Sequence, residues 1–239
     1  MLLEILLSDV SISEKLLALL VSIVTILPAL TFHEWAHGYV AYKLGDKTAK
    51  ADGRLSLNPL DHLDPIGSLM LLLVGFGWAK PVPVNTRHFK KPRRDFALTS
   101  FAGPLANFIV AFISVLLLVL SGNIFTATGF NGITAAVIQM VFEFSAVYNI
   151  GLGLFNLIPL PPLDGSNIVM CLLPNKIAAK YSQLRYYMHY VFIGLIILRR
   201  IPYLSIIPEI VFYPVTEGTY SLLLIFGKLA DLIISPFFG

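Results

Sequence analysis

The sequence of 239 residues is poor in charge, because Asp, Glu, Lys and Arg together make up only 13% of it. Hydrophobic residues make up 56%, and the mean hydropathy is +0.79. A soluble domain has about 25% charged residues. The scarcity of charge therefore excludes an ordinary soluble domain and indicates that lipid surrounds much of the chain.

Cysteine is almost absent, since Cys171 is the single one. One cysteine can form neither an internal disulfide nor a cysteine-rich metal site. A strong excess of one charge is also lacking, because the formal net charge is only +3. We therefore predict no nucleic-acid partner.

Long apolar runs, in contrast, recur along the chain. About 20 helical residues cross the hydrocarbon core of a bilayer. The runs are too continuous for the alternating strands of a barrel, and backbone groups in lipid must be paired within the segment. We predict an all-α polytopic membrane protein of about five to six transmembrane helices, forming a single domain over residues 1–239. The runs cover residues 16–30, 96–120, 133–158, 186–198 and 219–238.

The first third of the chain also predicts smaller elements. The first helix is expected from Ser13 to Leu44, where Gly45 favours a stop. Alternation in Lys50–Leu57 predicts a small membrane-associated β element. Ile66–Trp78 is apolar but too short to span, which favours a re-entrant or interfacial segment.

Basic residues indicate which side of the membrane each connection occupies. They are concentrated after the first helix and in residues 80–94, whereas residues 121–132 contain none. The positive-inside rule places the basic connections in the cytoplasm. Arg199 and Arg200 do not fit this alternation, so the topology of the C-terminal third stays open.

A group of polar residues, His33-Glu34-Trp35-Ala36-His37, lies within the first apolar helix. Two histidines four residues apart share one helical face, so both imidazoles can reach one metal ion. Glu34 is rotated by about 100° from His33, where it can reach a water at the metal without being a ligand. Such residues are costly at membrane depth unless they face a cavity or a metal.

A catalytic zinc site usually has three protein ligands, so one more is expected from elsewhere in the chain. Asp164 is the best candidate, because it follows a segment in which Pro159, Pro161 and Pro162 break a transmembrane helix. Broken backbone at membrane depth is tolerated where it lines a cavity or packs in protein. Glu143 is the main rival carboxylate, but it would lie nearer the opposite face of the membrane.

Two motifs in this sequence resemble those of the site-2 proteases. One is the H-E-x-x-H motif at His33–His37, and the other is N-x-x-P-x-P-x-L-D-G, which Asn156–Gly165 matches at every fixed position. A G-P-x-x-N element at Gly103–Asn107 is also similar to the family. The chain resembles a short form without an added peptide-binding or regulatory domain, with a catalytic core over residues 13–173 and variable helices over 174–239.

The resemblance implies an intramembrane metalloendopeptidase with one zinc ion per chain. His33, His37 and Asp164 would be the metal ligands and Glu34 the catalytic acid and base. Asn156 would stabilise the oxyanion or hold the broken helix, and Asn107 would join helices. The expected partners are the lipid bilayer and a transmembrane substrate, with the active site toward the cytoplasm of a bacterial-type cell membrane.

Two alternatives stay open at this point. A metalloprotease of the type that trims prenylated proteins also uses H-E-x-x-H, but its later ligand is a glutamate. A metal-transporting or ion-binding membrane protein could use the same three ligands without hydrolysis. The sequence identifies neither the physiological substrate nor the oligomeric state. If the chain is a protease, we expect the substrate to add as a β-strand to Lys50–Leu57, which would replace hydrogen bonds lost on unwinding.

Overall fold

The computed structural model describes residues 11–74, 77–198 and 206–238, and the regular structure within these ranges is helical. Four helices are long and apolar enough to cross a membrane. They are α2 (Ile12–Lys43), α5 (Pro92–Thr128), α6 (Ile133–Asn156) and the Phe212–Phe237 stretch that includes most of α9 (Ile206–Ile234). The all-α membrane fold is thereby supported.

The expected count of five to six spans is not reached among the described residues. The apolar run 186–198 belongs to α8 (Asn175–Leu198), which is not among the helices that are both long and apolar enough to cross a membrane. Its first half carries Lys176, Lys180 and Gln183, so the helix is apolar over too short a length. Arg199 and Arg200, on which the topology of this region depended, lie outside the described residues.

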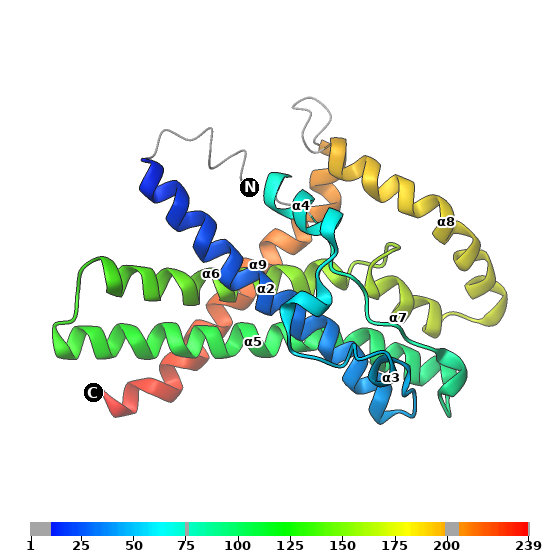
Figure 1. Ribbon diagram of the computed structural model, residues 1–239, viewed down its shortest axis with the longest axis horizontal. Helices are drawn as coiled ribbons and strands as arrows, with labels where there is room; N and C mark the ends of the chain where they lie inside the picture. Colours follow the sequence, from blue (N-terminus) through cyan, green and yellow to red (C-terminus); the bar gives the residue numbers. More distant parts are fainter. Residues whose placement is uncertain (1–10, 75–76, 199–205, 239) are drawn as a thin grey trace.

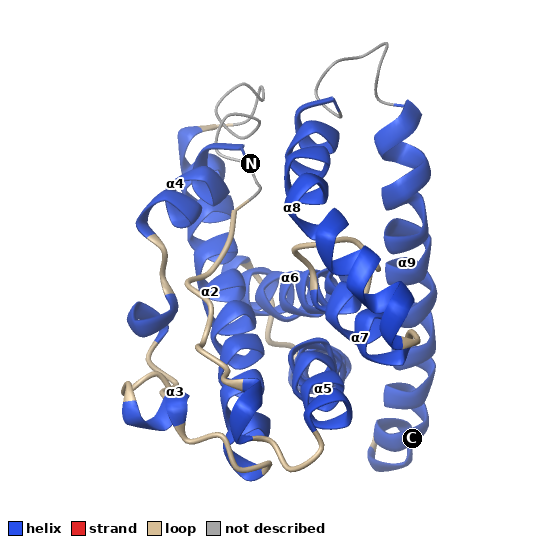
Figure 2. Cartoon of the chain, turned by 90° about the vertical axis from the view of Figure 1, so that its right-hand side faces the viewer, coloured by secondary structure: helices blue, strands red, loops and turns tan. Residues whose placement is uncertain are grey.

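Helices α5 and α6 form a central antiparallel pair (Figure 1). Gly129 and Gly132, at φ +69° and +88°, make the tight connection between them. Figure 2 shows α2 on one side of this pair and α9 on the other. The fold is therefore a three-layered helix bundle in which the central pair contacts both outer helices.

Three polar contacts at intervals along the pair hold α5 against α6. Asn107 donates to Asn149 at 2.8 Å, and Ser114 bonds Ser145 at 2.8 Å. Gln139 of α6 donates to the Ser121 hydroxyl at 3.3 Å. Residues 107, 114 and 121 are spaced by two helical turns and so share one face of α5. Hydrogen bonds of this kind join helices in a membrane and set their register.

Helix α2 begins and ends close to the predicted residues. Ser11 caps its N-terminus in a capping box with Glu14. The helix ends at Lys43, and Gly45 then adopts φ +112°, a left-handed conformation that favours glycine.

The β element predicted at Lys50–Leu57 is wrong, because this segment forms no strand. The substrate strand expected to pair with it therefore has no strand edge there in the unbound protein. Thr48–Ala51 form a single helical turn, α3, and Gly53 at φ +67° reverses the chain. Asp46 accepts from the Thr48 N–H at 3.0 Å, which favours the turn over a strand. Within the described ranges the nearest feature to a sheet is one isolated bridge between Leu63 and Ala79.

Asp46 joins the loop after α2 to the loop before α5. Its buried carboxylate accepts from Thr48, from the Asn85 N–H at 2.6 Å and from His88 at 2.9 Å. Burial raises the pKa of Asp46, but the hydrogen bonds from Thr48, His88 and Asn85 outweigh it and hold the pKa below its usual value. The two basic loops therefore lie together at one end of the bundle.

Two further elements complete this end of the chain. Helix α4 (Pro65–Val74) is too short to span, in agreement with the sequence, and whether it re-enters the membrane stays a prediction. His62, in the loop before α4, is 1% exposed and its Nε2 lies 2.8 Å from the Ser56 carbonyl oxygen, so this histidine is buried.

Candidate metal centre

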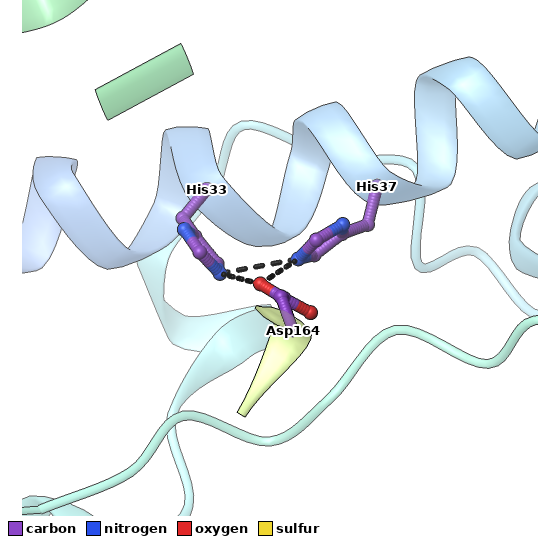
Figure 3. A group of neighbouring side chains, drawn as sticks. All are labelled: His33, His37 and Asp164. Carbon is purple, nitrogen blue, oxygen red and sulfur yellow. Dashed lines mark hydrogen bonds and ion pairs between the residues drawn. The ribbon is translucent and has the colours of Figure 1, made fainter. Parts of the chain in front are cut away.

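Three side chains from two helices converge on one point inside the bundle (Figure 3). His33 Nε2 and His37 Nε2 of α2 each lie 3.1 Å from Asp164 Oδ2. The two Nε2 atoms are 3.1 Å apart. Both histidines are buried, and Asp164 is largely so. The structure thus brings together the three ligands predicted from the sequence.

Local geometry explains why the histidines and Asp164 meet. The histidines lie one turn apart on the same face of α2. Asp164 is the first residue of α7 (Asp164–Leu172) and follows the proline-rich loop at the end of α6. A Cβ at Gly165 would lie only 2.2 Å from the Leu157 carbonyl oxygen, so the loop folds back where only glycine fits.

Arg93, in the first turn of α5, fixes the other end of α7. Its guanidinium donates to the carbonyls of Met170 and Leu173 and to the Asn175 side chain. A basic group is favourable at a helix C-terminus, where carbonyl groups lack partners in the helix. Helix α7 is therefore anchored at both ends, which holds Asp164 toward α2.

The tautomer of His37 follows from the contact that its Nδ1 atom makes. His37 Nδ1 lies 2.7 Å from the backbone carbonyl of Thr99. A carbonyl oxygen can only accept, so Nδ1 must donate. In the neutral ring, Nε2 then carries the lone pair, and this lone pair faces Asp164.

The side-chain amides of Asn149 and Asn107 fix the tautomer of His33 in the same way. Asn149 Nδ2 donates to the Ser145 carbonyl at 2.8 Å, which leaves its Oδ1 to accept from Asn107 Nδ2. Asn107 Nδ2 also donates to the Ala29 carbonyl, so Asn107 Oδ1 faces His33 Nδ1 at 2.6 Å. Neutral His33 therefore donates from Nδ1 and keeps the lone pair of Nε2 for the site.

When both rings are neutral, three acceptor atoms therefore face one another with no proton donor between them. They are the Nε2 atoms of His33 and His37 and Oδ2 of Asp164. Asp164 Oδ2 is buried, and no donor within the described chain satisfies it. Such an arrangement is unfavourable unless a cation binds there. Two imidazoles and one carboxylate are a usual ligand set of catalytic zinc, and second partners on the histidines are typical of metal sites. The residues therefore fit a zinc ion.

Gly103 of α5 leaves room for both histidines. A Cβ there would lie 2.4 Å from His37 Nε2 and 2.7 Å from His33 Cε1. No real Cβ approaches other atoms so closely. The glycine of the G-P-x-x-N element therefore packs directly against the candidate ligands.

The remaining predicted residues lie near this centre or apart from it. Glu34 is half-buried, and its Oε2 accepts from the Val82 N–H at 2.9 Å. Asn156 donates to the Leu152 carbonyl of its own helix at 3.0 Å, which favours the structural role. The rival Glu143 is exposed on α6 and is not part of the cluster.

Sequence reasoning missed three contributors to the site: Thr99, Asn149 and Val82. Asn149 did give a signal, because an amide within an apolar helix needs a partner in the membrane. Thr99 and Val82 act through backbone groups, which every residue carries, so their identity gave no signal. The role of Asn107 between helices was predicted, but not its contact with His33.

Fold and site together define a polytopic helical membrane protein with a candidate metal centre between α2 and α7. Residues 117–198, which include Asp164, match Peptidase family M50. A Bacillus subtilis protein named "Putative zinc metalloprotease YwhC" is 48% identical over 177 residues, covering 73% of this chain and 79% of that protein. The chain belongs to the M50 family of zinc metalloproteases, the site-2 proteases.

More distant relatives carry a similar name. "Putative zinc metalloprotease Rip2" of Mycolicibacterium smegmatis is 31% identical over 144 residues, and the protein of that name from Mycobacterium tuberculosis is 32% identical over 145 residues. In both cases the match covers 58% of this chain and 52% of the relative. No solved structure matches the chain significantly.

Gly103→Ala should disrupt the centre, because the added methyl group would displace both imidazoles. We expect zinc affinity to fall by roughly tenfold or more, measured by competition with a chromogenic chelator. Gly227→Ala is the matched control, since a Cβ at this α9 glycine meets nothing within 4 Å. Equal zinc affinity in Gly103→Ala and wild type would show that this packing does not hold the ligands.

Proposed function

We propose that the protein is a zinc-dependent intramembrane endopeptidase, with His33, His37 and Asp164 as metal ligands and Glu34 as the acid and base. The observation that carries this proposal is the convergence of three buried acceptor atoms at 3.1 Å beside Glu34. Family membership supports peptide hydrolysis. One zinc ion per chain satisfies the ligand set.

A zinc ion in this centre would supply Lewis-acid activation of water and of a peptide carbonyl. Glu34 lies on α2 next to His33 but is not one of the three converging ligands. Its carboxylate takes a proton from the attacking water and delivers it to the amine leaving group. Thr99 and Asn107 hold the histidine rings so that both Nε2 lone pairs stay directed at the site.

The substrate we propose is a transmembrane segment of another membrane protein. His37 lies six residues before the end of α2, which is about 9 Å along the helix. The peptide bond to be cut must therefore enter the membrane-level part of the bundle. A helical substrate has to unwind locally first, because its carbonyls are hydrogen-bonded within its own helix.

We place the active site toward the cytoplasmic side of a bacterial-type cell membrane. Asp46 bonds both Asn85 and His88, so the loops after α2 and before α5 lie at the same end of the bundle. These loops carry most of the basic residues among residues 1–100. The connection between α5 and α6, at residues 129–132, carries none. The positive-inside rule assigns the basic end to the cytoplasm.

Glu34→Gln separates a protease from a metal transporter. The amide keeps the size of the side chain but cannot take up the proton, so we expect zinc to stay bound while cleavage falls roughly 10²- to 10⁴-fold. The probe is a tagged single transmembrane helix of leucine and valine with a central asparagine–proline pair, and gel analysis follows its cleavage. Glu217→Gln, at an exposed glutamate of α9, is the control. Wild-type cleavage by Glu34→Gln would contradict the proposal.

Sidedness can be tested by cysteine labelling in a Cys171→Ser background. Lys90→Cys places an exposed thiol at the basic end, and Asn131→Cys places one in the exposed α5–α6 connection. An impermeant maleimide added to intact cells should label the cysteine at 131, and it should label the cysteine at 90 only after permeabilisation. The reverse pattern would invert the orientation.

A further inference from the structure

The segment Ala79–Asn85 runs beside α2 as an extended strap, and it is attached at both ends. At its start, the Lys80 N–H donates to the His62 carbonyl at 2.8 Å, and Arg54 donates to the Lys80 carbonyl at 2.8 Å. At its end, the Asn85 N–H donates to Asp46 at 2.6 Å. These contacts fix how the strap lies on the bundle.

The middle of the strap contacts the face of α2 that carries Glu34. Val82 is 7% exposed, and its Cγ1 lies 3.0 Å from the position of a Cβ at Gly38. Gly38 is one turn beyond Glu34 on the same helical face. A larger residue at position 38 would push the strap away, so this glycine allows Val82 to approach Glu34.

Within the strap, Val82 stands between two prolines. Pro81 and Pro83 have no N–H, so Val82 supplies the single backbone donor of this tripeptide. That donor bonds Glu34 Oε2 at 2.9 Å. Lys80 and Val82 each precede a proline, which favours extended backbone, and the prolines themselves restrict φ. The donor is thus held in position before any substrate binds.

We infer that the backbone N–H of Val82 is a positioning group for Glu34, an inference that rests on the proposed function. It holds one carboxylate oxygen so that the other, Oε1, is free to exchange protons with water and the leaving group. No hydrogen bond to Oε1 occurs in the part of the chain that the structure describes. A fixed carboxylate need not reorient during the reaction, which favours catalysis.

The test removes this one donor. Val82→Pro deletes the N–H at a position already flanked by prolines. A second variant, the ester variant, has the α-hydroxy acid analogue of valine at position 82, which replaces the N–H by an ester oxygen and keeps the isopropyl group. Val84→Pro is the matched control, because the Val84 N–H makes no hydrogen bond among the described residues. Zinc content, unfolding temperature, kcat and KM are measured, with the transmembrane probe defined above as substrate.

Both variants at position 82 should lower kcat about tenfold or more, while their KM and zinc content stay close to the wild-type values. The Val84→Pro enzyme should match wild type in all of these measurements. A merely structural role of the strap would also change KM or zinc content. If Val82→Pro loses zinc or stability, the ester variant alone decides. Wild-type kcat in the ester variant overturns the inference. Its failure is distinct from failure of the proposed function, which Glu34→Gln reports separately.

Discussion

The mutual approach of three acceptor atoms is the constraint on which the rest of the site depends. His33, His37 and Asp164 would repel one another in a buried position if both rings were neutral and nothing lay between them. The surrounding structure nevertheless holds them together. A bound cation would resolve this conflict, and it would link α2 to α7 across the centre of the bundle.

Much of the bundle serves to keep that arrangement in place. Asn149, Asn107 and the Thr99 carbonyl fix the tautomers of the two rings, so the site depends on α5 and α6 as well as on α2. Gly103 lets α5 pack directly against the two histidines, and Gly165 lets the proline-rich loop fold back next to Asp164. The polar contacts between α5 and α6 therefore both hold two helices together in lipid and orient His33, a candidate metal ligand.

The sequence predicted what depends on local spacing and composition. The bounds of α2, the shared face of His33 and His37, and the choice of Asp164 over Glu143 follow from periodicity and from the prolines that break the later helix. It failed at Lys50–Leu57, because the hydrogen bonds of Asp46 with Thr48, Asn85 and His88 shape this loop and Thr48–Ala51 form a helical turn instead of a strand. Backbone groups such as the Val82 N–H carry no side-chain signal, so only the folded chain identifies them.

Metal content tests the central claim most directly. Elemental analysis of the purified protein should find one zinc ion per chain in the wild type. Zinc should be lost in the His33→Ala/His37→Ala double variant and strongly reduced in Asp164→Ala, with Asp52→Ala, at an exposed aspartate, as the control. Absence of zinc from the wild type, or undiminished zinc in the double variant, would contradict the account.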